Sequence, residues 1–72
     1  MIRLRVKEVA ESKKIGKLRL SRIADVSYKT VKNVWDDPYR EISIRTLEKF
    51  AKALGVSSAE LIEDVPDNET RA

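Results

Sequence analysis

The chain has 72 residues, of which 15 are lysine or arginine and 12 are aspartate or glutamate, with no histidine and no cysteine, so its formal net charge is +3. This length supports one small domain without a large catalytic cleft, and the missing histidines and cysteines exclude disulfides, thiol catalysis and the usual zinc, iron and copper sites. No apolar run is long enough to cross a bilayer and the N-terminus lacks the apolar segment of a signal peptide, so we expect a soluble cytoplasmic protein with no metal, no cofactor and no membrane contact.

The charge is unevenly placed along the chain. Residues 1–35 hold ten basic and three acidic residues, a formal charge of +7, whereas residues 36–72 hold five basic and nine acidic residues, a formal charge of −4. A basic half on a folded segment favours a polyanionic partner, with nucleic acid as the first candidate. Uneven charge also arises by chance in short proteins, so the charge distribution does not by itself identify a nucleic-acid-binding protein.

The first third of the chain predicts two helices, since apolar residues recur at helical spacing and glycine and proline are rare. The first is expected at about Leu4–Lys14 and ends near Gly16. As a minor alternative, the alternation in Ile2–Arg5 is typical of an extended segment. Gly16 then serves as a weak N-cap of a two-turn helix over 17–24, which is too short to be stable without packing.

A third helix follows after only two residues, Asp25 and Val26. Ser27 is a good N-cap, and the helix is predicted over about 27–35 with its apolar positions turned inward. The polar residues of its opposite face are left for solvent or for a ligand: Tyr28, Lys29, Lys32 and Asn33.

A fourth helix is predicted after a turn at Asp36–Arg40. Ser43 caps it, and it extends from Ile44 to about Leu54 before Gly55 ends it. The capping-box sequence at 57–60 then opens a short fifth helix, which Pro66 ends. The acidic segment 66–72 has no apolar anchor, so we expect a flexible tail there and a domain over residues 1–65.

Two stretches of the sequence make a family resemblance specific. Two short helices joined by a tight turn are typical of a helix-turn-helix, although small helical bundles also contain such pairs. The stretches are residues 20–34 (LSRIADVSYKTVKNV) and 46–62 (TLEKFAKALGVSSAELI). Over roughly residues 4–64 the chain resembles the Cro/C1 (phage repressor-like) helix-turn-helix family. The resemblance implies an all-α, compact five-helix domain of the lambda-repressor type whose third helix enters the major groove of double-stranded DNA.

The resemblance also implies roles for single residues. Lys17 matches a position that contacts a backbone phosphate, and Ser27 matches the N-cap that lies near the DNA backbone. The outward residues of the third helix match positions that face base edges and flanking phosphates, and their chemistry agrees, since lysine can donate to guanine and asparagine can pair with adenine. The candidate DNA-binding residues are Lys17, Ser27, Tyr28, Lys29, Thr30, Lys32, Asn33, Tyr39 and Arg40.

Several of these candidates have a second interpretation. Lys29, Lys32 and Asn33 are also compatible with an ordinary solvated helix face. Thr30 either supports the first turn of its helix or contacts phosphate. Tyr39 and Arg40 lie in a loop where members of the family commonly contact phosphate. A purely structural role in the loop is nearly as well supported for both.

The sequence departs from the family pattern at the turn and at the end of the third helix. Asp25 stands where the family usually has glycine, and holding it in a left-handed conformation costs about 1 kcal/mol. Trp35 and Ala10 stand where the family often pairs a glutamate with an arginine. We therefore expect Trp35 to pack in the core rather than to contact DNA.

These observations predict a sequence-specific DNA-binding protein that acts as a small transcriptional regulator or repressor. It would bind a palindromic site as a homodimer, formed in solution or only on DNA, through the region of the fifth helix and its preceding loop. The alternative is a protein-interaction module, such as the antitoxin of a toxin pair, whose acidic half holds a basic protein partner. An enzyme is the weakest interpretation, because serines without histidine and scattered carboxylates offer no acid–base pair.

Overall fold

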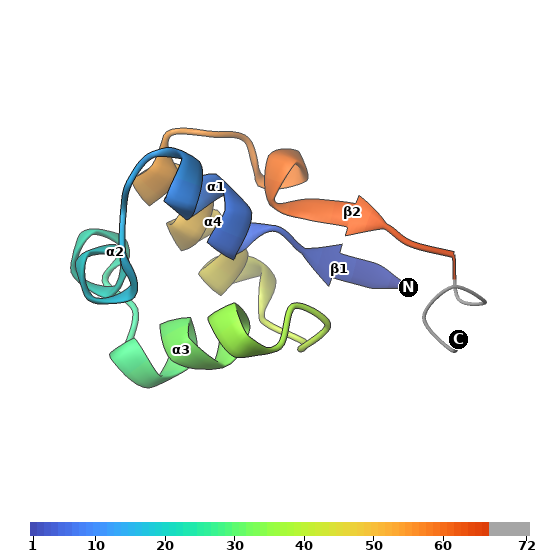
Figure 1. Cartoon of the computed structure of the whole chain (residues 1–72), viewed down its shortest axis with the longest axis horizontal. Helices are drawn as coiled ribbons and strands as arrows, with labels where there is room; N and C mark the ends of the chain where they lie inside the picture. The colour runs from blue at the N-terminus through green and yellow to red at the C-terminus, as the bar shows by residue number, and fades with distance from the viewer. Residues whose placement is uncertain (67–72) are drawn as a thin grey trace.

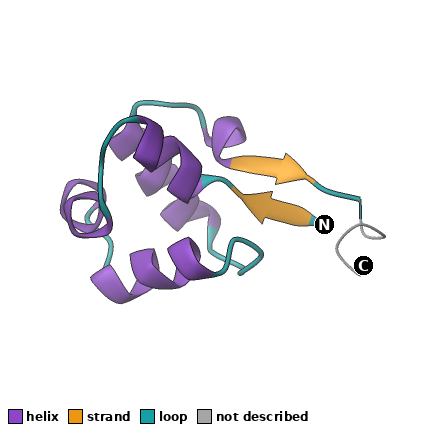
Figure 2. Ribbon diagram, in the orientation of Figure 1, coloured by secondary structure: helices purple, strands orange, loops and turns teal. Residues whose placement is uncertain are grey.

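Helices make up most of the described chain, and two short strands lie at its two ends (Figure 1). The computed structural model describes residues 1–66, so the predicted tail at 66–72 lies outside the described residues except for Pro66. Figure 2 shows the helices gathered into one body with the sheet at one end of it. The elements in chain order are β1 (Ile2–Leu4), α1 (Val6–Ser12), α2 (Lys17–Ala24), α3 (Tyr28–Asp36), α4 (Ile44–Leu54), the 3₁₀ helix η1 (Ser58–Leu61) and β2 (Ile62–Asp64).

Local capping residues set the helix boundaries much as predicted. The Oγ atoms of Ser27 and Ser43 accept hydrogen bonds from the backbone N–H groups of Thr30 (3.2 Å) and Thr46 (3.0 Å), so both serines are N-caps. Gly55 follows α4 with a φ of 70°, a left-handed conformation that glycine adopts without a steric penalty. The second, third and fourth predicted helices are therefore confirmed.

The core lies between α4 and the other helices. α4 packs against α1, α2 and η1, and α3 packs against α1 and α2. Trp35 is half-buried and packs against this core, as expected from its place on the apolar side of α3. The largest fully buried side chains are Phe50, Leu20, Leu61, Val6 and Val31.

The expected small, compact helical domain is confirmed, but not its all-α, five-helix form: residues 1–66 form four α-helices, and segments from opposite ends of this range pair as strands. β1 and β2 are antiparallel, with Leu4 opposite Ile62. The extended alternative for Ile2–Arg5 is therefore the correct one over β1, and the first helix is shorter than the predicted Leu4–Lys14. Strand pairing satisfies backbone groups that a lone extended segment would leave to water.

The predicted fifth helix is instead a single 3₁₀ turn, Ser58–Leu61. The Ser57 side chain makes no capping hydrogen bond, although its backbone carbonyl accepts one from the N–H of Glu60 at 3.0 Å. The backbone carbonyl of Leu61 accepts a hydrogen bond from the N–H of Arg5 at 2.6 Å. Pairing with the N-terminal segment thus replaces the bond that a further helical turn would have supplied.

An ion-pair cluster joins the sheet to α1. The Arg3 guanidinium donates hydrogen bonds to the Glu8 carboxylate and, over 3.1 Å, to Oε1 of Glu63. Burial by itself raises the pKa of Glu8, but hydrogen bonds from Arg3 and from the backbone, together with the charges of Arg3 and Arg5, bring that pKa below its ordinary value. Ionised Glu8 therefore stabilises the folded chain.

Acid is expected to remove this contribution. Because the pKa of Glu8 is lower in the folded chain, its stabilising effect is present above the unfolded pKa of about 4.3 and is lost as the pH falls through the folded pKa. Since the pair is partly exposed, Glu8→Gln should lower the free energy of unfolding at neutral pH by only about 0.3–1 kcal/mol. Urea denaturation of both proteins at neutral pH and at about pH 2.5 measures the effect.

The exposed Glu11 on the same helix provides the control. Glu11→Gln is expected to change the free energy of unfolding by less than about 0.3 kcal/mol at either pH, as is usual for a surface substitution. A destabilisation by Glu8→Gln that persisted at low pH would contradict an electrostatic origin.

Candidate nucleic-acid interface

α2 and α3 form a tightly joined pair of helices. The connection consists of Asp25, Val26 and Ser27. Asp25 has φ of 56° and ψ of 48°, the left-handed conformation expected for it. Its backbone carbonyl accepts a hydrogen bond from Nζ of Lys49 over 3.4 Å, so α4 contacts the turn as well. The pair has the geometry of a helix-turn-helix.

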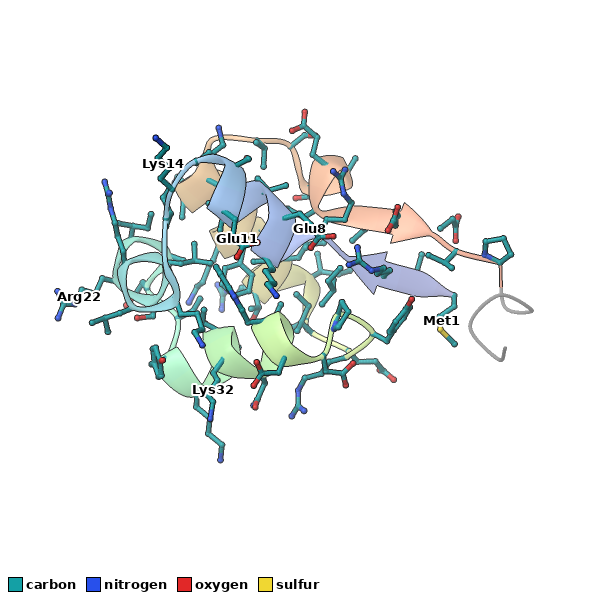
Figure 3. All side chains as sticks on the ribbon, in the orientation of Figure 1. Met1, Glu8, Glu11, Lys14, Arg22 and Lys32 are labelled. Carbon is teal, nitrogen blue, oxygen red and sulfur yellow. The ribbon has the colours of Figure 1, made fainter. Side chains whose placement is uncertain are left out.

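The polar face of α3 is directed away from the core. Val31 and Val34 are buried, whereas Lys29 and Lys32 are exposed and Tyr28 is 45% exposed. Figure 3 shows Lys32 extending from α3 into solvent. Neither lysine forms an ion pair with any residue in the described range 1–66, so both charges are available to a ligand.

Asn33 lies at the border between the polar face of α3 and the core and is half-buried. Its backbone carbonyl accepts a hydrogen bond from the N–H of Asp37 at 2.9 Å. Within residues 1–66 its side-chain amide has no hydrogen-bond partner. The amide therefore keeps a donor and an acceptor for a ligand, the combination that pairs with N7 and N6 of adenine.

The hydroxyl groups of Ser27 and Thr30 share a hydrogen bond of 2.8 Å at the start of α3. Ser27 also accepts the bond from the Thr30 backbone, so the two residues hold the first turn of the helix together. The structural interpretation of Thr30 is therefore supported, while Ser27 remains exposed beside the exposed face of α3.

Lys17 is the first residue of α2 and is half-buried. At about 1.5 Å per residue, it lies about 10 Å along the helix from the turn that leads into α3. Arg19 and Arg22 are exposed on the same helix, and Figure 3 shows Arg22 extending away from it. α2 thus adds basic side chains beside α3.

The loop between α3 and α4 holds the last two candidates, Tyr39 and Arg40. The Asp37 carboxylate accepts a hydrogen bond from the N–H of Tyr39 (3.1 Å), and the Asp37 carbonyl accepts one from the N–H of Arg40 (3.2 Å). The carbonyl of Pro38 accepts a hydrogen bond from the N–H of Leu4 (2.6 Å), which ties the loop to β1. Both candidates line a groove beside the sheet rather than the exposed face of α3.

Sequence reasoning missed two residues at this site. Asp36 is exposed and ends α3, one helical turn after Lys32, so it adds a carboxylate to the lysine-bearing face. Continuing the helical spacing of the outward-facing residues from Lys32 to the next position on that face would have identified Asp36 from the sequence. Lys49 contacts the turn from α4, and no local sequence signal indicates that contact.

Only some of the basic residues in the N-terminal half of the sequence lie together on the surface that α2 and α3 form. Arg3 belongs to the ion-pair cluster, and Nη1 of Arg5 donates to the carbonyl of Glu60 over 3.4 Å. Figure 3 shows Lys14 and Lys32 on opposite sides of the molecule. The basic residues that α2 and α3 carry are Lys17, Arg19, Arg22, Lys29 and Lys32.

Residues 1–66 offer neither a metal site nor a membrane span. This part of the chain contains no group of three or more His, Cys, Asp or Glu side chains that could hold a metal ion. None of its helices combines the length and the apolar character that a membrane span requires.

A tight helix-turn-helix whose second helix exposes lysine and tyrosine and carries a half-buried asparagine at the border of that face is typical of a class of DNA-binding proteins. The family model of the Cro/C1-type HTH DNA-binding domain matches residues 5–67, most of the chain. The protein therefore belongs to the Cro/C1-type helix-turn-helix family, which confirms the resemblance of its sequence. None of the curated proteins gives a significant match to the chain.

Proposed function

We propose that residues 1–65 act as one DNA-binding domain of a small transcriptional regulator, which binds specific sites in double-stranded DNA with α3 in the major groove. The observation that carries this proposal is the exposed polar face of α3, held by the turn and by the buried face of the same helix. A helix of about 10–12 Å in diameter fits a major groove about 12 Å wide.

Within this arrangement Lys29 and Asn33 contact base edges, Tyr28 contacts a thymine methyl group or a phosphate, and Lys32 contacts a flanking phosphate. The phosphate contacts fix the orientation of the domain, and the base contacts give the sequence preference. Lys17 and Ser27 supply further contacts to the DNA backbone, whereas Thr30 holds the first turn of α3 and Tyr39 and Arg40 belong to the groove beside the sheet.

The regulator acts as a symmetric homodimer on a palindromic site, in the cytoplasm and without a cofactor. Two copies of α3 then enter successive major grooves about 34 Å apart. An isologous dimer matches the two-fold symmetry of such a site.

The salt dependence of binding tests this proposal. If four or five phosphates are neutralised per subunit, a plot of log K against log salt concentration should have a slope of roughly −7 to −9 for a dimer. Fluorescence anisotropy of a labelled duplex, measured from about 50 to 300 mM salt, gives the slope. A slope near zero would exclude binding through phosphates.

Two lysine variants make the same experiment specific to α3. Lys32→Ala should make the slope shallower by roughly one unit per subunit, because one phosphate contact is lost. Lys14→Ala removes an equal charge from the opposite side of the molecule and should leave the slope within error. Equal effects of the two variants would contradict docking through α3.

A further inference from the structure

A groove of about 380 Å³ lies beside the two-stranded sheet, next to the loop that connects α3 to α4. Its floor is apolar and comes from β1, β2, the loop before α4 and α4 itself, and its rim carries two opposite charges on adjacent residues, Arg40 and Glu41. Its apolar lining includes Ile2, Leu4, Tyr39, Ile42, Leu47 and Ile62.

The sheet has two different faces. Side chains alternate along a strand, so Ile2 and Leu4 share one face of β1, and Leu4 lies opposite Ile62 on that face. Arg3 points to the other face and forms its ion pair with Glu63 there. One face is therefore closed by a salt bridge, whereas the other opens into the groove.

Large apolar side chains remain exposed around this groove. Ile2 is 49% exposed, Tyr39 is 43% exposed, and Ile44, which precedes Leu47 by one helical turn on α4, is 78% exposed. Single exposed apolar residues are normal on a protein surface, but a cluster that borders a groove indicates an interaction site.

We propose that a second copy of this chain occupies the groove and that the resulting symmetric contact is the dimer interface. In a two-fold contact, residue i of one copy meets residue j of the other and the reverse contact also forms. Arg40 and Glu41 then meet their opposite charges twice across the axis, because each copy carries both on its rim. The groove is thus complementary in charge to itself.

The dimensions of the molecule agree with this placement. Its principal extents are 36 × 23 × 22 Å, and the sheet lies toward one end of the long axis (Figures 1 and 2). Copies that meet at the sheet end separate their α3 helices along the long axis. This arrangement is compatible with the spacing of about 34 Å between successive major grooves. This part of the argument rests on the proposed function.

The size of the end face predicts a weak dimer. A cross-section of 23 × 22 Å corresponds to roughly 400–500 Å² per copy, about half of what a stable interface of standard size buries per partner. We therefore expect a weak monomer–dimer equilibrium, which adjacent half-sites on DNA would shift toward the dimer.

Sedimentation equilibrium without DNA tests the interface. The wild-type chain should associate to dimers at a few hundred micromolar. Arg40→Glu alone and Glu41→Arg alone should each weaken the dimer roughly tenfold or more, because like charges then face each other twice. The double variant Arg40→Glu/Glu41→Arg should restore dimerisation to within about threefold, a rescue that general destabilisation cannot produce.

Two further variants control for exposed apolar surface. Ile44→Glu should also weaken the dimer, and the acid suits the first turn of α4. Leu18→Glu changes an exposed residue on α2, outside the groove, and should leave the dimer unchanged. A monomeric wild type, charge reversals without effect, or loss of the dimer only in Leu18→Glu would overturn the proposal.

The proposed function is decided by a separate measurement. Anisotropy of labelled DNA on the same proteins reports binding whether or not a dimer forms in its absence. DNA binding by a chain that stays monomeric at these concentrations rejects the groove as the dimer interface and leaves the DNA-binding proposal intact. Dimerisation without DNA binding would reject the DNA-binding proposal and leave the groove as the dimer interface.

Discussion

Replacing Asn33 with alanine is expected to abolish the preference of the protein for one base pair of its DNA site. The variant should bind that site more weakly by about 1–3 kcal/mol per subunit, because an adenine loses a bidentate partner. The amide has no competing hydrogen bond in residues 1–66, so its removal should not disturb the helix. Selection of bound sites from random DNA, followed by anisotropy on the selected site, measures both effects.

Two neighbouring lysines separate base contacts from phosphate contacts in the same experiment. Lys29→Ala should relax the preference at a different base pair from that affected by Asn33→Ala. Lys32→Ala should weaken binding to all sequences by a similar factor. An unchanged base preference after Asn33→Ala would remove this residue from the base-contacting set.

Replacing Phe50 with alanine is expected to cost about 3–5 kcal/mol in the free energy of unfolding. Phe50 is 0% exposed and is the largest fully buried side chain of the described chain. A small domain has a total stability of only about 5–15 kcal/mol, so most or all of it would be lost. Circular dichroism during heating and urea titration gives the change directly.

Two substitutions on the same helix provide the comparison. Phe50→Leu keeps most of the buried volume and should cost less than about 2 kcal/mol. Lys52→Ala changes an exposed side chain of α4 and should stay within about 0.5 kcal/mol of the wild type. A cost below 1 kcal/mol for Phe50→Ala would contradict a close-packed core around this ring.

The helices could be predicted because their signals are local. Ser27, Ser43 and Gly55 determine helix ends through bonds to residues at most four positions away. The left-handed conformation of Asp25 follows from the short connection between two helices, but that of Lys14, with a φ of 59°, carried no comparable signal. Lysine does not favour this region, but Lys14 closes the end of α1: its N–H donates to the carbonyl of Glu11 (3.0 Å) and the N–H of Ile15 donates to that of Ala10 (2.9 Å), as in a left-handed helix C-cap.

The sheet could not be predicted with the same certainty. β1 and β2 have three residues each, and their partners are some sixty positions apart in the sequence. Alternation over such a short stretch fits a strand or the start of a helix equally well. The capping-box pattern at Ser57 failed for the same reason, because pairing with β1 competes with a further turn of helix.

The part of the candidate site that lies on a single helix could be predicted from the sequence. The part that several elements assemble together could not. The exposed face of α3 follows from the spacing of its apolar residues, and the structure places Tyr28, Lys29 and Lys32 on it. The groove that Tyr39 and Arg40 line is assembled from four separate segments. The groove depends on the pairing of β1 with β2, which local sequence patterns did not predict.

The pairing of β1 with β2 also bears on how this fold can be joined to other proteins. The N–H of Val65 donates to the carbonyl of Met1 over 2.8 Å, and the Met1 amino group donates to the carbonyl of Val65 over 3.0 Å. Residues paired in this way have Cα atoms about 5.5 Å apart. A host protein could therefore carry the whole domain as an insertion within one of its surface loops, entering and leaving through adjacent strands, with little distortion of the loop.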